Sequence, residues 1–356
     1  MSALPTEYGP LVRELHRLAA QNRQPVNGTF ELTERCNLAC KMCYIHRGED
    51  DKAQQSTELS AAVWLELARQ GVDNGMVFLL LTGGEPLLRP DFFKIYTPLT
   101  KMGLLVTLFT NGTLITENIA ARLAEAPPSR TEITLYGATA ETYEAVTGVP
   151  GSFKRCLEGI EALVKYKIPL GLKSTLTRKN VHELEAMRQM AKDWGLPFSA
   201  DWLLAVRRDG TGSGAGECRL PAADCVELEA ASRASATDRV EAALREGPIE
   251  NDVNFYCQAG RAAFVINHTG EMNTCVLLDR PSARPLDTGF MRAWEEVQRY
   301  IDTAPSLHTT CLACAGRSYC PRCPAWSQLE SKTLNEPVPY LCQIAFARKE
   351  LYEKQA

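Results

Sequence analysis

Three cysteines lie within eight residues near the start of the chain, in the stretch TERCNLACKMCYIH. Cys36, Cys40 and Cys43 have the spacing C-x3-C-x2-C and follow a short apolar run. Three thiolates can hold three corners of a cubane [4Fe–4S] cluster and leave the fourth iron open to a ligand. Such a triplet is compatible with an iron–sulfur site that has a free coordination position. A zinc knuckle and inert core thiols are the alternatives.

A second motif, Gly83-Gly84-Glu85-Pro86, closes the apolar run that begins at Met76. A glycine pair at the end of a strand exposes backbone groups, so it can hold a small zwitterion close to the chain. Glu85 and the glycine carbonyls could accept hydrogen bonds from the ammonium group of such a ligand.

Seven of the thirteen cysteines lie in the last hundred residues, and these seven are called the tail cysteines below. They are Cys257, Cys275, Cys311, Cys314, Cys320, Cys323 and Cys342. Pairs with the spacing C-x2-C are common zinc ligands, so zinc is one candidate for this region. The distribution indicates two metal regions separated by a scaffold.

The composition is that of an ordinary globular protein, since 45% of the 356 residues are hydrophobic and 23% are charged. A net charge of −4 gives no basic surface for nucleic acid or an anionic membrane. The first residues have an amphipathic helix pattern rather than that of a signal peptide, and no apolar stretch approaches the length of about 18 residues that spans a membrane. We therefore expect a cytoplasmic protein, in which dense cysteines more often hold metal than disulfides.

Strand-like and helix-like segments alternate between the two cysteine regions. The expected strands are residues 28–33, 76–84, 104–112, 132–137, 169–177 and 198–206, and the expected helices are residues 56–71, 91–103, 116–126, 152–167 and 180–195. Six strands joined by helical crossovers imply a parallel sheet, either curled as a partial barrel or opened as a doubly wound sheet. In both, ligands gather at the carboxyl ends of the strands, where the cysteine triplet and the glycine motif fall.

The triplet, the GGEP motif and this alternation together resemble the radical S-adenosylmethionine (SAM) superfamily over residues 28–206. The resemblance implies an α/β fold, a partial (β/α)6 TIM barrel. It also implies that the open iron binds the amino and carboxylate groups of SAM. The reduced cluster then cleaves SAM to a 5′-deoxyadenosyl radical, which takes a hydrogen atom from a substrate. The three front cysteines would be catalytic cluster ligands, and Gly83, Gly84 and Glu85 would contact SAM.

Further SAM contacts follow from the same resemblance. Thr134 stands where relatives often use serine to contact the ribose, and Lys173 stands where some place a basic residue. A plain strand residue and a solvated rim charge are the respective alternatives. Relatives usually carry an aromatic residue just before the third cysteine, near the adenine, but this chain has Met42. A thioether can pack on adenine, and Tyr44 could supply the ring.

The tail cysteines resemble the SPASM extension of radical SAM enzymes, which houses two auxiliary [4Fe–4S] clusters. The usual spacing has one residue more between Cys320 and Cys323 than this chain has. The resemblance assigns one cluster to Cys311, Cys314, Cys320 and Cys342, and the other to Cys257, Cys275 and Cys323. Because the second set has only three members, its cluster either has an open iron or is closed by Cys218 or Cys225. Otherwise those two are buried thiols, like Cys156.

We thus expect four parts: an N-terminal helical segment (1–27), the radical SAM partial barrel (28–206), a connector (207–250) and a C-terminal Cys-rich iron–sulfur SPASM domain (251–356). Arg207 and Arg208, after the last expected strand, either meet an acidic peptide or form a solvated charge pair. Some residues near strand ends either line the cleft or pack in the core, namely Tyr136, Tyr143, Asp201 and Trp202.

Enzymes with a SPASM extension act mostly on peptides and proteins, so the resemblance implies a ribosomally made precursor peptide as substrate. Auxiliary clusters imply an oxidative outcome: a thioether, a carbon–carbon or carbon–oxygen crosslink, or a desaturated residue. We expect a reductant such as flavodoxin or ferredoxin to supply electrons. A separate leader-binding protein, or the cleft itself, would recognise the leader of the peptide.

Other functions remain as alternatives. An anaerobic sulfatase-maturating enzyme, which forms formylglycine, resembles the chain in all three cysteine regions. Such relatives, however, carry an aspartate base directly after the cysteine that Cys275 matches, and this chain has Val276 there. A small-molecule maturase of cofactor biosynthesis is the second alternative. The third is a non-catalytic iron–sulfur or zinc protein, such as an electron carrier or regulator, which would need no SAM pocket.

Overall fold

A computed structural model describes residues 8–45, 47–209, 215–231 and 254–354. One sheet in the described part of the chain has the strand order β10-β9-β1-β4-β5-β6-β7-β8. The strands are β1 (Asn27–Glu31), β4 (Phe78–Thr82), β5 (Leu105–Thr110), β6 (Arg130–Thr134), β7 (Leu170–Thr175), β8 (Phe198–Asp201), β9 (Ala263–Ile266) and β10 (Met272–Asn273). Neighbouring strands are parallel except β9 and β10, which are antiparallel.

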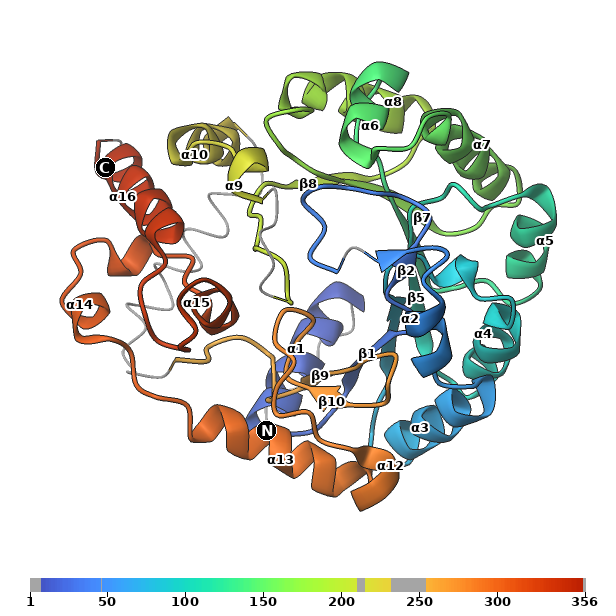
Figure 1. Cartoon of the computed structure of the whole chain (residues 1–356), viewed down its shortest axis with the longest axis horizontal. Coiled ribbons are helices and arrows are strands. Elements are labelled where there is room, and N and C mark those ends of the chain that lie inside the picture. Colours follow the sequence, from blue (N-terminus) through green and yellow to red (C-terminus); the bar gives the residue numbers. More distant parts are fainter. Residues whose placement is uncertain (1–7, 46, 210–214, 232–253, 355–356) are drawn as a thin grey trace.

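Helices cover the outer side of this sheet and connect its parallel strands. Figure 1 shows α3, α4, α5 and α7 in an arc outside the strands. The connecting helices are α3 (Ala61–Asp73), α4 (Phe92–Lys101), α5 (Glu117–Glu125), α6 (Ala140–Thr147), α7 (Ser152–Lys165) and α8 (Leu184–Asp193). Strand and helix alternate from β1 to β8, so the expected α/β partial barrel is confirmed, and the expected strands are β1 and β4 to β8.

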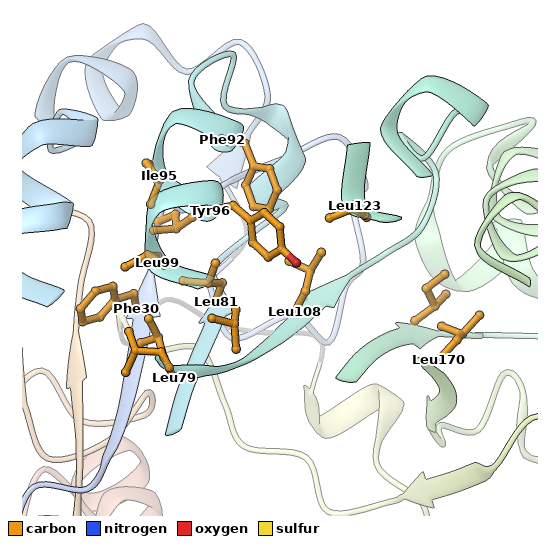
Figure 2. Packing of buried hydrophobic residues seen from close by; sticks show 14 of the residues in the cluster. Phe30, Leu79, Leu81, Phe92, Ile95, Tyr96, Leu99, Leu108, Leu123 and Leu170 are labelled. Carbon is orange, nitrogen blue, oxygen red and sulfur yellow. The ribbon is translucent and has the colours of Figure 1, made fainter. Parts of the chain in front are cut away.

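The hydrophobic core lies between the strands and these helices (Figure 2). Leu79 and Leu81 of β4 and Leu108 of β5 are buried, as are Ile95 and Leu99 of α4. Buried residues alternate along both strands because successive strand side chains point to opposite faces. Full burial of one such leucine contributes about 1.5–3 kcal/mol relative to exposure, so this layer holds the strand ends in fixed positions.

The helix expected over residues 56–71 is in fact two helices, α2 (Lys52–Thr57) and α3. Ser60 caps α3, because its hydroxyl accepts a hydrogen bond from the Val63 N–H at 3.4 Å. A serine at this position satisfies a backbone donor that would otherwise have no partner, so the helix restarts after Ser60.

The C-terminal region is part of the same sheet. Strand β9 pairs in parallel with β1, so that Asn27 lies opposite Ala263 and Phe30 lies opposite Ile266. The described residues also form two short paired strands, β2 (Arg35–Cys36) and β3 (Arg47–Gly48). The other α-helices are α1 (Tyr8–Gln21), α9 (Ala215–Cys218), α10 (Ala222–Ala231), α12 (Pro285–Thr288), α13 (Phe290–Asp302), α14 (Thr309–Leu312), α15 (Pro324–Ser331) and α16 (Pro339–Glu353), and the 3-10 helices are η1 (Pro86–Leu88), η2 (Val181–Glu183) and η3 (Arg317–Tyr319).

Part of the expected connector, 207–250, lies outside the described residues, and α9 and α10 fall within the rest of it. The expected domain limits therefore remain predictions. None of the helices in the described ranges is both long and apolar enough to cross a membrane.

Candidate functional site

A cavity of about 440 Å³ lies at the carboxyl ends of the barrel strands. Thr82, Thr110, Thr134 and Thr175 are the last residues of four adjacent strands, β4 to β7, and all of them line it. Further lining comes from the front cysteine loop, the segment after β8 and the C-terminal region, namely Cys36, Leu38, Cys40, Met42, Cys43, Tyr44, Leu203, Leu204, Ala205, Val276, Leu277 and Trp326. The cavity therefore joins parts of the chain that are far apart in sequence.

The three front cysteines all reach this cavity from one loop. The N–H of Ala39, within the loop, donates to the Thr147 carbonyl at 2.8 Å, which fastens the loop to the end of α6. Burial raises the pKa of Cys36 to about 12 and also raises that of Cys40, and nearby negative groups add to both shifts. Thiols that are buried this close together stay protonated unless a cation stabilises the thiolate form, as happens when each sulfur binds a metal.

The glycine pair packs against the backbone that leads into the front cysteines. A Cβ on Gly83 would clash with the carbonyl oxygen of Thr33, and one on Gly84 would clash with that of Arg35. The Gly84 N–H donates to the Thr33 carbonyl at 2.7 Å, and the Glu85 N–H donates to the Arg35 carbonyl at 2.9 Å. Only glycine allows this approach. Both glycines line the cavity, but their packing role was not foreseen from the sequence.

Glu85 is fully buried and is not among the residues that line the cavity. Its carboxylate accepts hydrogen bonds from the N–H of Asn111 at 2.7 Å, the N–H of Leu87 at 3.0 Å and the hydroxyl of Thr110 at 2.9 Å. Burial raises the pKa of Glu85 to about 7, against these hydrogen bonds. The carboxylate thus holds the end of β5, and its expected contact with an ammonium group stays a prediction.

Asn111 is a site residue that sequence reasoning missed. It lines the cavity, and its Nδ2 lies 3.7 Å from the sulfur of Cys36 and donates to the side-chain oxygen of Asn37 at 2.9 Å. Its Oδ1 accepts from the hydroxyl of Thr113 at 2.7 Å, which orients the amide. The signal in the sequence was the triplet TNG at the end of an apolar strand, at the edge where ligands gather.

Met42 and Tyr44, the two candidates for the adenine contact, both line the cavity. Met42 is buried, and the hydroxyl of Tyr44 donates to Glu31 at 3.1 Å. Tyr136 lines the cavity as well, and its hydroxyl interacts with Cys40. The other residues named for the cleft are not part of its lining: Tyr143, Asp201 and Trp202.

Thr134 and Lys173 lie opposite each other on β6 and β7, and both line the cavity. The Nζ of Lys173 lies 3.0 Å from the centre of the Phe109 ring and 3.7 Å from a carboxylate oxygen of Glu132. Burial lowers the pKa of Lys173 to about 8, and Glu132 opposes this shift. Lys173 is therefore held between a ring and a carboxylate, not solvated at the rim.

The C-terminal region completes the cavity with an apolar wall. Val276 and Leu277 directly follow Cys275, and Trp326 lies on α15 just after Cys323. Leu277 and Trp326 pack in one cluster with Leu203 and Ala205 of the segment after β8. Val276 thus lines the cavity directly after Cys275, and a valine side chain cannot take up a proton.

Within each of the two sets that the resemblance implied, the tail cysteines lie close enough together to influence one another's pKa. In the larger set, electrostatic interactions connect Cys311, Cys314, Cys320 and Cys342. In the smaller set, they connect Cys257, Cys275 and Cys323. Burial raises the pKa of Cys275 to about 12 and that of Cys320 to about 11. Their roles as cluster ligands remain predictions.

The other three cysteines lie elsewhere, and all thirteen are in the described part of the chain with free thiols. Cys156 is buried in the barrel core, and Cys218 packs in the cluster that contains Met42. The sulfur of Cys225 lies 3.4 Å from the hydroxyl of Tyr340 on α16. Whether Cys218 or Cys225 completes the smaller set of tail cysteines therefore stays a prediction.

The cysteine sets are not arranged as ligands of a single ion. Within the described residues, no three His, Cys, Asp or Glu side chains surround one point at ligand distance. In a cubane cluster each thiolate binds a different iron, so the sulfurs stand farther apart than the ligands of one zinc ion.

Comparison with known proteins agrees with this geometry. Residues 30–191 match the model of the Radical SAM superfamily. The barrel is therefore similar to the radical SAM domain. The match runs from β1 to α8 and includes the front cysteines and the glycine motif, whereas the C-terminal region lies outside it.

Several known proteins are similar to the chain beyond residues 30–191. The AdoMet-dependent heme synthase of Methanosarcina barkeri is 29% identical over 349 residues, which cover 91% of this chain and 98% of that protein. Mycofactocin maturase MftC of Mycobacterium tuberculosis is 27% identical over 325 residues, or 87% of this chain and 81% of MftC. The crystal structure of Streptococcus suis SuiB bound to its precursor peptide SuiA shares the fold, with a TM-score of 0.71 at 18% identity over 96% of this chain and 82% of SuiB.

The match of residues 30–191 to the Radical SAM superfamily implies a [4Fe–4S] cluster and SAM. The residues present fit both groups. Three thiols from one loop line one cavity, and the strands around it contribute hydroxyl, amide and ammonium donors. The volume of about 440 Å³ lies within the range of about 300–1,000 Å³ that is typical of pockets for small ligands.

Proposed function

We propose that this protein is a radical SAM oxidoreductase that modifies a peptide. The observation that carries the proposal is the single cavity lined both by the three front cysteines and by Val276 and Leu277, next to Cys275. A substrate radical formed there would arise beside a segment that leads directly to a tail cysteine. A non-catalytic iron–sulfur protein has no need of such a cavity.

In this proposal the front cysteines hold the cluster, and the strand ends hold SAM. When bound, these groups supply a 5′-deoxyadenosyl radical that takes a hydrogen atom from the substrate. Asn111 donates a hydrogen bond to the Cys36 sulfur and stabilises its thiolate. Lys173 provides a cationic donor for a carboxylate, and Thr134 on the neighbouring strand provides a hydroxyl for the ribose. The apolar wall excludes water from the reacting atoms.

The two sets of tail cysteines would hold two auxiliary [4Fe–4S] clusters that accept a second electron from the substrate radical. The product would then be oxidised: a thioether, a carbon–carbon or carbon–oxygen crosslink, or a desaturated residue. Formylglycine formation is not proposed, because Val276 stands in the cavity wall in place of the required base.

The peptide substrate is supported by relatives rather than by the geometry alone. MftC is named as a maturase, and SuiB was crystallised with a precursor peptide. We infer a precursor peptide as substrate, a flavodoxin or ferredoxin as reductant, and leader recognition by a separate protein or by the cleft.

A heme precursor is the second candidate substrate. It is favoured by the relative from Methanosarcina barkeri, which is named a heme synthase and matches this chain over 98% of its own length. It also corresponds to the small-molecule maturase that the sequence left open.

The test begins with anaerobic reconstitution and a count of iron and sulfide. Three clusters correspond to about twelve irons per chain. SAM and dithionite are then added, and 5′-deoxyadenosine is measured. A variant in which the three front cysteines are serine should form none of it. Zinc in place of iron, with no cleavage of SAM by the unaltered protein, would refute the proposal.

The substrate class is tested in the same assay. Short peptides encoded beside the gene are compared with iron porphyrins that carry carboxylate side chains. Only the true substrate should raise 5′-deoxyadenosine formation and give a product whose mass reflects oxidation. A mass change confined to the porphyrin would replace the peptide proposal with the second candidate.

A further inference from the structure

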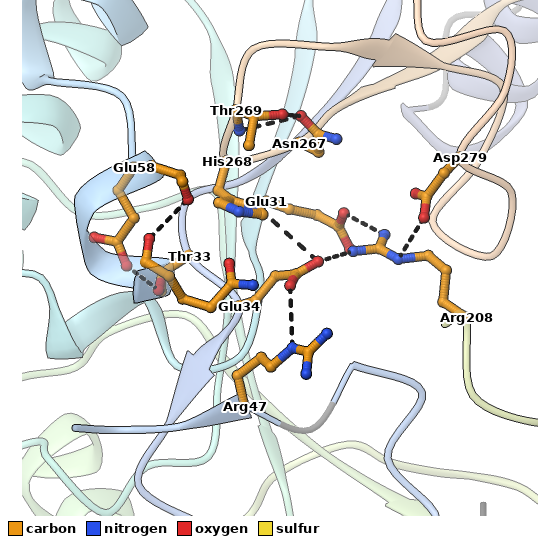
Figure 3. A network of polar contacts seen from close by, with 12 residues as sticks. Glu31, Thr33, Glu34, Arg47, Glu58, Arg208, Asn267, His268, Thr269 and Asp279 are labelled. Atoms are coloured by element: carbon orange, nitrogen blue, oxygen red, sulfur yellow. Dashed lines mark hydrogen bonds and ion pairs between the residues drawn. The ribbon is translucent and has the colours of Figure 1, made fainter. Parts of the chain in front are cut away.

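Arg208 lies just after the last barrel strand, with only 7% of its side chain exposed. Its Nη1 donates to Glu31 at 2.7 Å, its Nη2 donates to Glu34, and its Nε lies 3.2 Å from Asp279 (Figure 3). The same Nη1 also donates to the Val276 carbonyl at 3.0 Å. The sequence analysis gave two alternatives for this side chain, contact with an acidic peptide or a solvated charge pair. Both expectations are wrong, because acceptors within the protein already occupy its donors.

The same arginine also holds the front cysteine loop. Its backbone N–H donates to the Tyr44 carbonyl at 3.0 Å, and the Tyr44 hydroxyl shares the acceptor Glu31 with the guanidinium. Tyr44 follows the third front cysteine, Val276 follows Cys275, and both line the cavity. Arg208 therefore connects the two cysteine regions at the residues that form the cavity wall.

We propose that Arg208 is a positioning residue that keeps the Val276–Leu277 wall closed over the SAM side of the cavity. This inference rests on the proposed function. A guanidinium suits the role because its planar fork presents several donors in fixed directions, whereas the single ammonium of lysine cannot reach all these acceptors at once. The wall, in turn, decides whether small solutes reach the cavity.

Closure has a chemical consequence for a radical enzyme. If a thiol reductant enters the cavity, the 5′-deoxyadenosyl radical takes the hydrogen of its S–H group. A C–H bond forms, an S–H bond breaks, and a thiyl radical leaves. In D2O the S–H group of dithiothreitol becomes S–D, so this unproductive reaction labels 5′-deoxyadenosine with deuterium. Deuterium content therefore reports how well the wall is closed.

The variant must not leave a buried charge without a partner. Arg208→Gln alone would leave the carboxylate of Glu31 without its cationic partner, and that side chain is fully buried. We therefore choose the double variant Glu31→Gln/Arg208→Gln, with Arg208→Lys as a second variant that keeps the charge. The control is Arg47→Gln, since Arg47 also pairs with Glu34, at 3.8 Å, but its side chain is 38% exposed.

The first readout needs neither cluster nor SAM. In the apoprotein, hydrogen–deuterium exchange of the backbone over residues 274–280 should be at least about tenfold faster in both Arg208 variants and unchanged in the control. Protection over β4 should stay as in the unaltered protein. Equal exchange over 274–280 in all proteins would overturn the proposal. So would faster exchange spread equally over β4 and 274–280, because Arg208 would then serve only the fold.

The second readout uses reconstituted protein with SAM, dithionite and dithiothreitol in D2O, without peptide. The deuterated share of 5′-deoxyadenosine should rise about threefold in both Arg208 variants and not in Arg47→Gln. An unchanged share would overturn the proposal. If the unaltered protein forms no 5′-deoxyadenosine, the proposed function fails, whereas the exchange measurement still tests the positioning role.

Discussion

The side-chain amide of Asn111 lies 3.7 Å from the sulfur of Cys36, while the backbone N–H of Asn111 donates to Glu85 at 2.7 Å. One residue at the end of β5 thus contacts both the front cysteine loop and the glycine motif. Asn111 thus connects two loops beside the cavity that are separate in the sequence.

The first prediction concerns this contact. A hydrogen bond to a thiolate stabilises the more negative, reduced cluster, so Asn111→Ala should lower its reduction potential. If the bond is about 1.4 kcal/mol stronger in the reduced state, the shift for one electron is roughly 60 mV. A redox titration followed by electron paramagnetic resonance measures it. Asn37→Ala is the control, since Asn37 bonds to Asn111 without donating to the sulfur; an equal shift there would contradict the explanation.

A second prediction concerns the close approach at Gly84. Gly84→Ala places a methyl group against the Arg35 carbonyl, so the front loop must move away from the strand end. We expect a loss of about 1–3 kcal/mol in the free energy of unfolding and of about four irons per chain. Gly48→Ala is the matched control, because a Cβ there meets nothing within 4 Å. Full iron content in Gly84→Ala would show that the contact does not shape the first cluster site.

The third prediction is the pH dependence of SAM binding. Burial lowers the pKa of Lys173 to about 8, so its ammonium is present at pH 7 and largely lost at pH 9.5. If the ammonium binds the SAM carboxylate, affinity should fall roughly tenfold over this interval. Titration of reconstituted protein with SAM measures the affinity, and Lys173→Met should remove the pH dependence. Lys154→Met, at a side chain that is 84% exposed, should retain it.

A fourth prediction concerns the stability of the protein without SAM. Stability should rise with pH, whereas the affinity for SAM should fall. Between pH 8 and 10.5 the unfolded chain keeps the proton on Lys173 and the folded chain has lost it. The free energy of unfolding should therefore rise with pH in this window, by at most about 3 kcal/mol. Urea unfolding at pH 7.5 and pH 10, with Lys173→Met as reference for other groups, measures the contribution. Equal slopes in both proteins would show that Lys173 is not desolvated.

Iron content separates the ligand cysteines from the plain thiols, which is the fifth prediction. Cys323→Ser and Cys320→Ser should each lose up to about four irons per chain, since they belong to different sets. Cys225→Ser should lose none, because the Cys225 sulfur lies against Tyr340 on α16. Iron loss from Cys225→Ser would show that Cys225 is a cluster ligand, namely the fourth ligand of the smaller set.

Most of the barrel could be predicted from the sequence, because each strand is short, apolar and followed by a helix pattern. The predicted strand over residues 104–112 is β5 (Leu105–Thr110), and that over 169–177 is β7 (Leu170–Thr175). Strand β9 was missed, because a run of four residues between cysteines carries no sign of its partner. Pairing with β1 depends on the whole tertiary arrangement, which local pattern does not contain.

The candidate site was predictable where chemistry requires a residue type at a fixed spacing. The front cysteines and the glycines fall at one cavity for this reason. The role of Arg208 was not predictable, because its acceptors come from β1 and from the loop after Cys275, both distant in sequence. The residues next to Arg208 in the sequence do not indicate whether its charge is buried or solvated.

The pairing of β9 with β1 also bears on how the protein is made. Strand β1 leaves the ribosome early, but its partner, residues 263–266, follows only after more than two hundred further residues. Until then one edge of β1 has no strand to pair with, and an open edge can join a neighbouring chain. Ribosomes that stall before residue 263 should therefore release nascent chains that depend on a chaperone to stay apart.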